Sequence, residues 1–115
     1  MKGRPRPRRA KVRRATHRPV TAAGFPVLAG LCRGYLHEDF LEEHGSPTAA
    51  LRCFRADASR EERELAAVEW GRFWSRARNL SLERLRRVLA EAFGSAWRPR
   101  SRAELTAVFD VLREP

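Results

Sequence analysis

The chain has 115 residues, a length that suits one domain, and its 24 basic and 14 acidic side chains give a net charge of +10. Residues 1–24 hold nine basic side chains and no acidic one, while the other 91 residues hold 15 basic and 14 acidic side chains. The near-neutral remainder argues against classing the whole chain as a basic nucleic-acid-binding domain. No apolar run is long enough to cross a bilayer, and none of signal-peptide length follows the basic start.

Residues 1–24 offer few apolar side chains to bury, and Pro5, Pro7 and Pro19 would interrupt a helix there. We therefore expect a disordered basic tail. An alternative hypothesis is that translation starts at Val20. The chain has 22 arginines and 2 lysines, which is typical of GC-rich coding DNA, where valine codons often serve as starts.

From Phe25 onward the sequence predicts helices and no strands. Pro26 suits a first helical position, and apolar residues then recur at spacings of three and four. We expect one helix from Pro26 to a left-handed cap at Gly45. Gly30 and Gly34 weaken this helix by about 1 kcal/mol each relative to alanine, so they suggest close packing or a bend.

Serines stand where the N-caps of four further helices are expected: Ser46, Ser59, Ser81 and Ser101. The second and fourth serines are followed three residues later by glutamate, the capping-box pattern. These helices should end near Asp57, Arg78, Gly94 and Leu112. In the helix that Ser59 caps, we expect Leu65 and Val68 on the apolar face. The expected fold is thus all-α: a single compact domain of about five short helices over residues 25–115, preceded by the basic tail over residues 1–24.

Residues 37–44 contain the densest cluster of polar side chains. His37-Glu38 matches the start of the HExxH zinc-protease motif, but Leu41 stands where the second histidine belongs, and His44 comes at the helix end. No nucleophile elbow, phosphate-binding loop or dinucleotide-binding motif occurs. We therefore expect a binding protein and not an enzyme, with no catalytic residue, no metal ligand and no cofactor.

Asp39 shares the expected helix face with Cys32 and Tyr35, which would place an acid at the margin of the core. A carboxylate in that position needs a hydrogen-bond partner, such as a backbone N–H or an arginine. We favour a structural role, in which Asp39 caps the next segment, over a direct functional one.

A series of short motifs resembles, in order, the small helical immunity proteins of contact-dependent growth inhibition systems. Residues 35–40 (YLHEDF) are similar to the family's YFHQDW stretch. Residues 25–28 match its opening FPxL, residues 45–51 match the helix start after the aromatic motif, and residues 81–85 are similar to its SxEEL start. Residues 94–101 resemble the turn before its final amphipathic helix.

The resemblance extends over about residues 25–113, with some departures. Glu38, Phe40 and Trp97 stand where glutamine, tryptophan and tyrosine are commoner, so size and polarity are roughly kept. The resemblance implies a cytoplasmic bacterial protein that binds the toxin domain delivered by a neighbouring cell and blocks it. Such toxins are often nucleases with basic surfaces, so acids would steer encounter and aromatic anchors would supply affinity.

On this interpretation the candidate toxin-binding residues are acids and tryptophans: Glu38, Asp39, Glu42, Glu43, Glu61, Glu62, Glu64, Trp70, Trp74 and Trp97. The family-motif residues either hold the fold or contact the toxin: Tyr35, His37, Asp39 and Phe40. The acids at 61–64 also suit a helix start, and the tryptophans also suit a core, so both roles stay open.

The alternative function is a nucleic-acid-associated module whose arginine-rich tail binds phosphates weakly and without sequence specificity. Against it, the folded part offers no basic helix face in the sequence and no nucleic-acid-reading motif. Deleting residues 1–24 would abolish binding by such a module but not by a toxin inhibitor.

Overall fold

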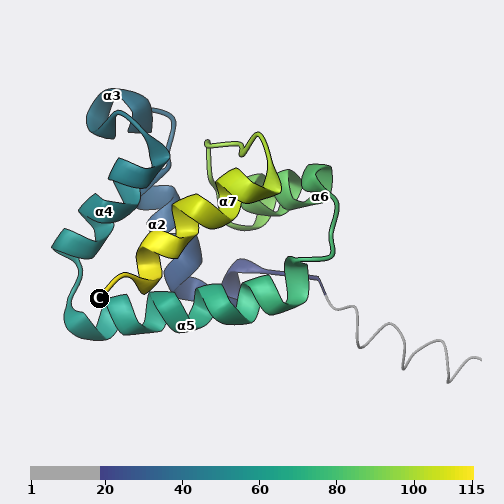
Figure 1. Cartoon of the computed structure of the whole chain (residues 1–115), viewed down its shortest axis with the longest axis horizontal. Coiled ribbons are helices and arrows are strands. Elements are labelled where there is room, and N and C mark those ends of the chain that lie inside the picture. Colours follow the sequence, from purple (N-terminus) through teal and green to yellow (C-terminus); the bar gives the residue numbers. More distant parts are fainter. Residues whose placement is uncertain (1–18) are drawn as a thin grey trace, which may run out of the picture.

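The computed structural model of the chain describes residues 19–115, and all regular secondary structure within them is helical (Figure 1). The predicted all-α fold is confirmed. The elements are η1 (Ala22–Gly24), α2 (Pro26–Tyr35), α3 (Phe40–His44), α4 (Pro47–Asp57), α5 (Arg60–Ala77), α6 (Leu82–Arg87), η2 (Val88–Ala92), α7 (Arg102–Phe109) and η3 (Asp110–Arg113). The expected disorder of the basic tail concerned residues 1–24, of which residues 1–18 lie outside the described residues. For the last of them it is wrong, because Ala22–Gly24 form η1, and Val20 and Ala22 pack against the core.

The longest helix, α5, runs along one side of the molecule, and α2 and α7 lie over it (Figure 1). Helices α3 and α4 are at the end where α5 begins, and α6 is at the end where α5 finishes. The element η2 continues α6 with π-type hydrogen bonding. None of the helices within residues 19–115 combines the length and apolar character that crossing a bilayer requires.

Aromatic rings from four segments meet in the core. Trp70 stacks on Phe109, with ring centroids 4.7 Å apart. Phe73 makes edge contacts with Phe25 at 5.8 Å and with Phe93 at 5.4 Å. Such aromatic pairs add about 0.5–1.5 kcal/mol each beyond the area that they bury. The start of α2, the middle of α5, the end of η2 and the end of α7 are therefore joined by one cluster.

A buried carboxylate joins α5 to the beginning of α2. Phe25 occupies the N-cap position of α2 and has no side-chain oxygen to cap it. Glu69, only 6% exposed, takes that role from α5, because its two carboxylate oxygens accept the backbone N–H groups of Leu28 at 2.9 Å and Val27 at 3.2 Å. The carboxylate satisfies two orphan donors and places negative charge at the positive end of the helix.

The four predicted serine N-caps are confirmed, since each side chain accepts the N–H three residues ahead. The capping box of Ser59 is complete. The second predicted capping box is wrong in one half, because the Glu104 carboxylate accepts the N–H of Arg100 and not that of Ser101. Gly45 and Gly94 adopt the left-handed conformations expected at helix ends, with φ of 86° and 73°.

The single helix expected from Pro26 to Gly45 is wrong, because the chain breaks between α2 and α3. The carbonyl of Leu36 accepts the N–H of Ala96 at 2.7 Å, while the N–H of Phe40 turns back to the carbonyl of His37. Both Leu36 and Phe40 are buried. A long-range backbone hydrogen bond and core packing therefore replace a helical turn that local periodicity favoured.

Among the apolar residues expected along α5, Phe73 is buried, but the placement of Leu65 and Val68 on its apolar face is wrong. Leu65 and Val68 are 46% and 61% exposed, whereas the buried face is formed by Ala66, Glu69, Trp70, Phe73 and Ala77. The aromatic side chains bury more area than Leu65 and Val68, and the Glu69 contact with α2 fixes the same rotation. Close packing at Gly30 and Gly34 is not found, because no atom lies within 4 Å of an added Cβ at either position.

Replacing Glu69 with alanine should lower the free energy of unfolding by about 2–4 kcal/mol, because two buried N–H groups would lose their acceptor. Chemical denaturation of the variant measures this loss. The matched control is Glu64→Ala on the exposed face of the same helix, which should change stability by less than about 0.5 kcal/mol. Equal denaturation midpoints for Glu69→Ala and the unmodified chain would contradict the role of this carboxylate.

Two glycine-to-alanine substitutions should have opposite effects on the melting temperature. Gly30→Ala should stabilise by about 0.5–1 kcal/mol, since Gly30 is an exposed helical position with free space around an added Cβ. Gly94→Ala should destabilise, because φ is 73° and the new Cβ would lie 3.0 Å from Cγ of Arg33. Calorimetric melts of both variants test the pair, and shifts of the same sign would refute the expectation.

Candidate protein-binding surface

The short helix α3 presents a group of acidic side chains to solvent. Burial of Phe40 orients α3, and the residues around it point outward. The exposed group consists of Glu38, Asp39, Leu41, Glu42 and Glu43, and the apolar Leu41 in it is 59% exposed. The sequence-based expectation that Asp39 lies at the margin of the core, on the face of Cys32 and Tyr35, is therefore wrong. It occupies the N-cap position of α3, but its side chain makes no capping hydrogen bond.

The first turn of α5 carries a second acidic group, formed by the exposed Glu61, Glu62 and Glu64. Glu62 completes the capping box, and Glu64 lies 3.4 Å from Arg60 in an exposed ion pair. Helix α4 leads from α3 to α5, and its 11 residues correspond to a length of about 16 Å. We name the two acidic groups together the acidic face; it occupies the end of the molecule where α5 begins (Figure 1).

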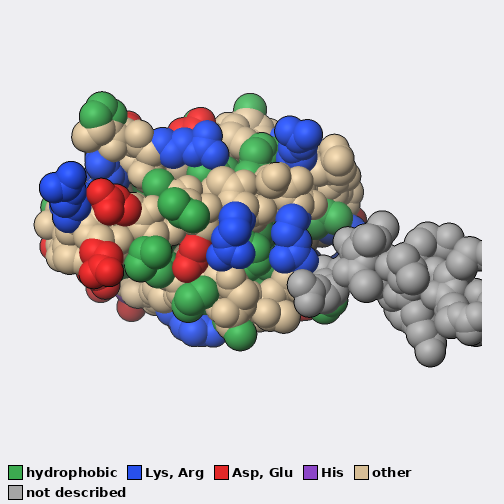
Figure 2. Space-filling view, turned by 90° about the horizontal axis from the view of Figure 1, so that it is seen from below, with side chains coloured by type: hydrophobic (Ala, Val, Ile, Leu, Met, Phe, Trp, Pro, Cys, Tyr) green, Lys and Arg blue, Asp and Glu red, His purple; other side chains and the backbone are tan. Residues whose placement is uncertain are grey.

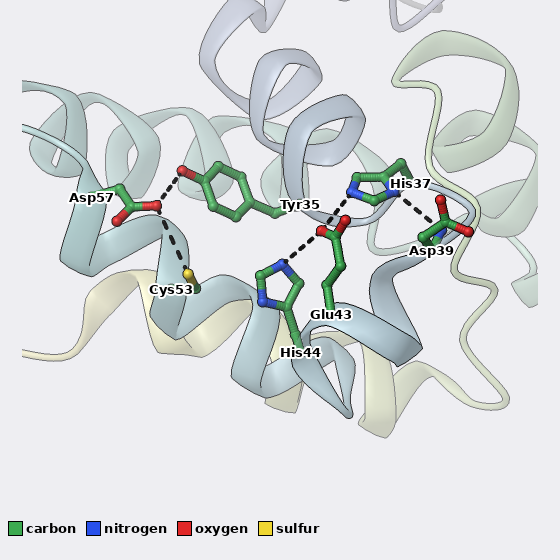
Figure 3. Close-up of polar contacts among 7 residues, drawn as sticks. All are labelled: Tyr35, His37, Asp39, Glu43, His44, Cys53 and Asp57. Atoms are coloured by element: carbon green, nitrogen blue, oxygen red, sulfur yellow. Dashed lines mark hydrogen bonds and ion pairs between the residues drawn. The ribbon is translucent and has the colours of Figure 1, made fainter.

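Two histidines meet one carboxylate oxygen within the acidic face (Figure 3). Nδ1 of His37 accepts the backbone N–H of Asp39, so the hydrogen bond assigns the proton of the neutral ring to Nε2. That Nε2 lies 3.1 Å from Oε1 of Glu43, and Nε2 of His44 lies 3.7 Å from the same atom. His37 and Glu43 therefore fasten the turn between α2 and α3 to α3 itself.

Tyr35 and Asp57 join the end of α2 to the end of α4 (Figure 3). The phenol of Tyr35 donates to Oδ2 of Asp57 at 2.8 Å, and the Cys53 thiol donates weakly to the same oxygen at 3.8 Å. The hydrogen bond to Asp57, with burial and the aspartate charge, raises the pKa of Tyr35 to about 12. Burial of the side chain, followed by the Asp57 charge, raises the pKa of Cys53.

Neither thiol has the character of a nucleophile. Burial raises the pKa of the Cys32 thiol to about 12, and the pKa of Cys53 is also raised, so both are protonated at neutral pH. Both cysteines are free. Within residues 19–115 no three histidine, cysteine or acidic side chains are grouped so as to hold a metal ion.

Two of the three tryptophan candidates are part of the core. Trp70 is 1% exposed and Trp97 is 7% exposed, so neither is available as a surface anchor. Trp70 lies between Phe109 and Trp74, and Trp74 is only partly buried. The core role that the sequence left open for tryptophan is therefore the one that Trp70 and Trp97 have.

The exposed apolar side chains near the acids are aliphatic, and sequence reasoning missed them. Leu65 lies four residues after Glu61, and Val68 lies three residues after Leu65. All three side chains therefore share one face of α5. That spacing was visible in the sequence, but it could be recognised only with Trp70 assigned to the opposite, buried side. Apart from its place at a helix end, nothing in the sequence identified Asp57 as the hydrogen-bond partner of Tyr35.

A shallow hollow lies beside the second acidic group, between α2, the end of α4 and the start of α5. Its volume is about 430 Å³, and it is lined by Pro26, Val27, Gly30, Leu31, Tyr35, Phe54, Asp57, Ala58 and Glu62. The hollow has an apolar floor and carboxylates at its margin. A long basic side chain has the matching shape, with an apolar stem and a charged tip.

The opposite end of the molecule holds a basic groove, which the sequence did not indicate. It has a volume of about 960 Å³, and four arginines from three helices line it: Arg33, Arg76, Arg84 and Arg87. The rest of the lining is apolar or uncharged apart from one acid: Pro19, Val20, Thr21, Ala22, Asn79, Leu80, Val88, Ala92 and Glu91. Arg84 and Arg87 share one face of α6, and Arg33 and Arg76 join them from α2 and α5, so the sequence-based expectation of no basic helix face on the folded part was incomplete.

No protein-family model matches the chain, and no curated protein or solved structure matches it either.

The alkaline titration of Tyr35 tests the geometry of the acidic end. The chain has one tyrosine, so phenolate absorbance reports Tyr35 alone. In the folded chain its pKa should be about 12, and Asp57→Asn should lower the pKa toward the usual value of 10.0. Because the folded pKa is raised, the stabilisation is complete below about pH 10 and is lost as the pH rises toward about 12. A folded chain that titrates with the same pKa as the chain in denaturant would contradict the Tyr35–Asp57 hydrogen bond.

Proposed function

We propose that the chain is an immunity protein that binds the toxin domain of a contact-dependent growth inhibition system and neutralises it by occlusion. The observation that carries the proposal is the acidic face, in which acids on the motif helix α3 surround an exposed leucine. The proposal also rests on the resemblance of residues 25–113 to such proteins.

Charge and apolar contact have different tasks on such a surface. Long-range attraction between the acidic face and a basic toxin would raise the association rate, and this effect weakens with salt. Leu41, Leu65 and Val68 would supply buried apolar area at the centre of the contact. The hollow beside Tyr35 would receive a lysine or arginine of the toxin, whose charged tip would meet Asp57 and Glu62.

Occlusion suits a rigid surface better than a mobile one. The acids of α3 stand on a helix that is fixed by the buried Phe40 and by the His37–Glu43 contact. A surface already in its binding conformation loses less conformational entropy on association. We therefore expect α3 to bind without rearrangement.

Calorimetry of the full chain with the toxin-like C-terminal domain encoded beside it tests the proposal. We expect a dissociation constant in the nanomolar range or below, equivalent to about −12 kcal/mol. The double variant Glu38→Lys/Glu42→Lys should slow association at least about tenfold, because both side chains are exposed and make no contact that holds the fold. The double variant Glu83→Lys/Glu91→Lys, with the same charge change near the other end, is the matched control.

Tight binding that both double variants leave unchanged would show that the acidic face is not the contact surface. Absence of binding to any neighbouring toxin domain would refute the immunity function. A toxin that binds but stays active would refute occlusion of its active site.

A further inference from the structure

Charges are segregated along the folded part of the chain. Residues 38–64 carry eight acidic and four basic side chains, whereas residues 65–104 carry four acidic and nine basic ones. On the face seen in Figure 2, acidic side chains gather on the half farther from the grey segment, where Lys and Arg side chains also stand, whereas the half beside it shows Lys and Arg side chains with almost no acid. The near-zero net charge of this region therefore conceals two ends of opposite sign.

Three of the four arginines that line the basic groove are available to a ligand. Arg33, Arg84 and Arg87 are exposed, and within residues 19–115 none of them forms an ion pair with an acid. Among the described residues that line the groove, Glu91 is the only acid. Uncompensated guanidinium groups around one hollow produce a positive potential that attracts anions.

The position of Arg33 depends on a glycine. Its side chain passes over Gly94, where a Cβ would come within 3.0 Å of Cγ and 3.2 Å of Nε of the arginine. The absence of a side chain at Gly94 thus lets Arg33, which belongs to α2, lie beside the end of η2. This contact brings a third helix into the rim of the groove.

We propose that the basic groove binds the phosphodiester backbone of a nucleic acid without sequence preference. The chain enters the groove at Pro19, a lining residue, and residues 1–18 before it carry nine basic side chains and no acidic one. Four arginines in the groove, together with this number of basic side chains in the sequence before it, suit a polymer with one negative charge per nucleotide better than a single small anion. Arginine binds phosphate oxygens through two parallel hydrogen bonds.

This site is independent of the proposed toxin contact. Three of its four arginines come from the last turns of α5 and α6, at the end of the molecule opposite the acidic face, and the two surfaces share no residue. The groove lacks aromatic lining residues on which bases could stack. Recognition therefore depends on phosphate contacts, which predicts strong salt dependence and little discrimination between sequences.

Fluorescence anisotropy of the full chain with a labelled single-stranded oligodeoxynucleotide of about 20 nucleotides, titrated at several salt concentrations, tests the proposal. The double variant Arg84→Gln/Arg87→Gln should reduce the slope of log affinity against log salt by about 1.4, or about 0.7 for each phosphate that is no longer neutralised. The matched control is Arg52→Gln/Arg60→Gln, which removes the same charge at exposed positions on α4 and α5. Thermal melts establish that both variants are folded.

If the slope of log affinity against log salt becomes smaller in the groove variant and is unchanged in the control variant, the result supports nucleic-acid binding in the basic groove. Equal slopes for the two variants would assign binding to residues 1–18 alone or to overall charge, and would overturn the proposal. Competition by poly-glutamate as strong as by unlabelled oligonucleotide at equal charge would also overturn it, because the groove would then suit an acidic protein.

Discussion

The rest of the structure depends on the carboxylate of Glu69 at the N-terminus of α2. Phe25 cannot cap this helix, so an acid from the middle of α5 accepts two of its backbone N–H groups in the interior. A buried carboxylate is tolerated only when its lone pairs are satisfied, and the helix end satisfies them with N–H donors and a favourable dipole. The contact fixes α2 across α5 and sets the rotation of α5. That rotation sends the ring of Trp70 inward and leaves Val68 in solvent.

The acidic face follows from this placement of α2. The helix ends at Tyr35, and the carbonyl of Leu36 pairs with Ala96 instead of continuing the helix. The chain then starts a new helix, α3, at an orientation that a continuous helix would not allow. Burial of Phe40 turns the acids of α3 outward, and Glu43 holds both histidines beside it. The contact surface is therefore built by core packing, and its charged side chains contribute little to stability themselves.

Local signals in the sequence were sufficient for the starts of every α-helix except α3, and tertiary contacts decided what the sequence could not show. The serine caps and the glycine ends depend on neighbouring residues, so the patterns around Ser46, Ser59 and Gly45 identified them. The break after Tyr35 depends on Ala96, some sixty residues away, and the burial of Glu69 depends on α2. The two surfaces differ in the same way. The acids of α3 are close together in the sequence and were predicted as a group. The arginines of the basic groove come from three helices and were not.

The central claim is that one small helical domain presents two separate contact surfaces, an acidic face for a protein and a basic groove for a polyanion. Amide chemical-shift mapping of the ¹⁵N-labelled full chain tests it most directly. With the toxin domain added, the shifts should concentrate in residues 38–43 and 61–68; with an oligonucleotide added, they should concentrate around Arg33 and residues 84–92. Shifts from both ligands at one and the same end of the molecule would contradict the account.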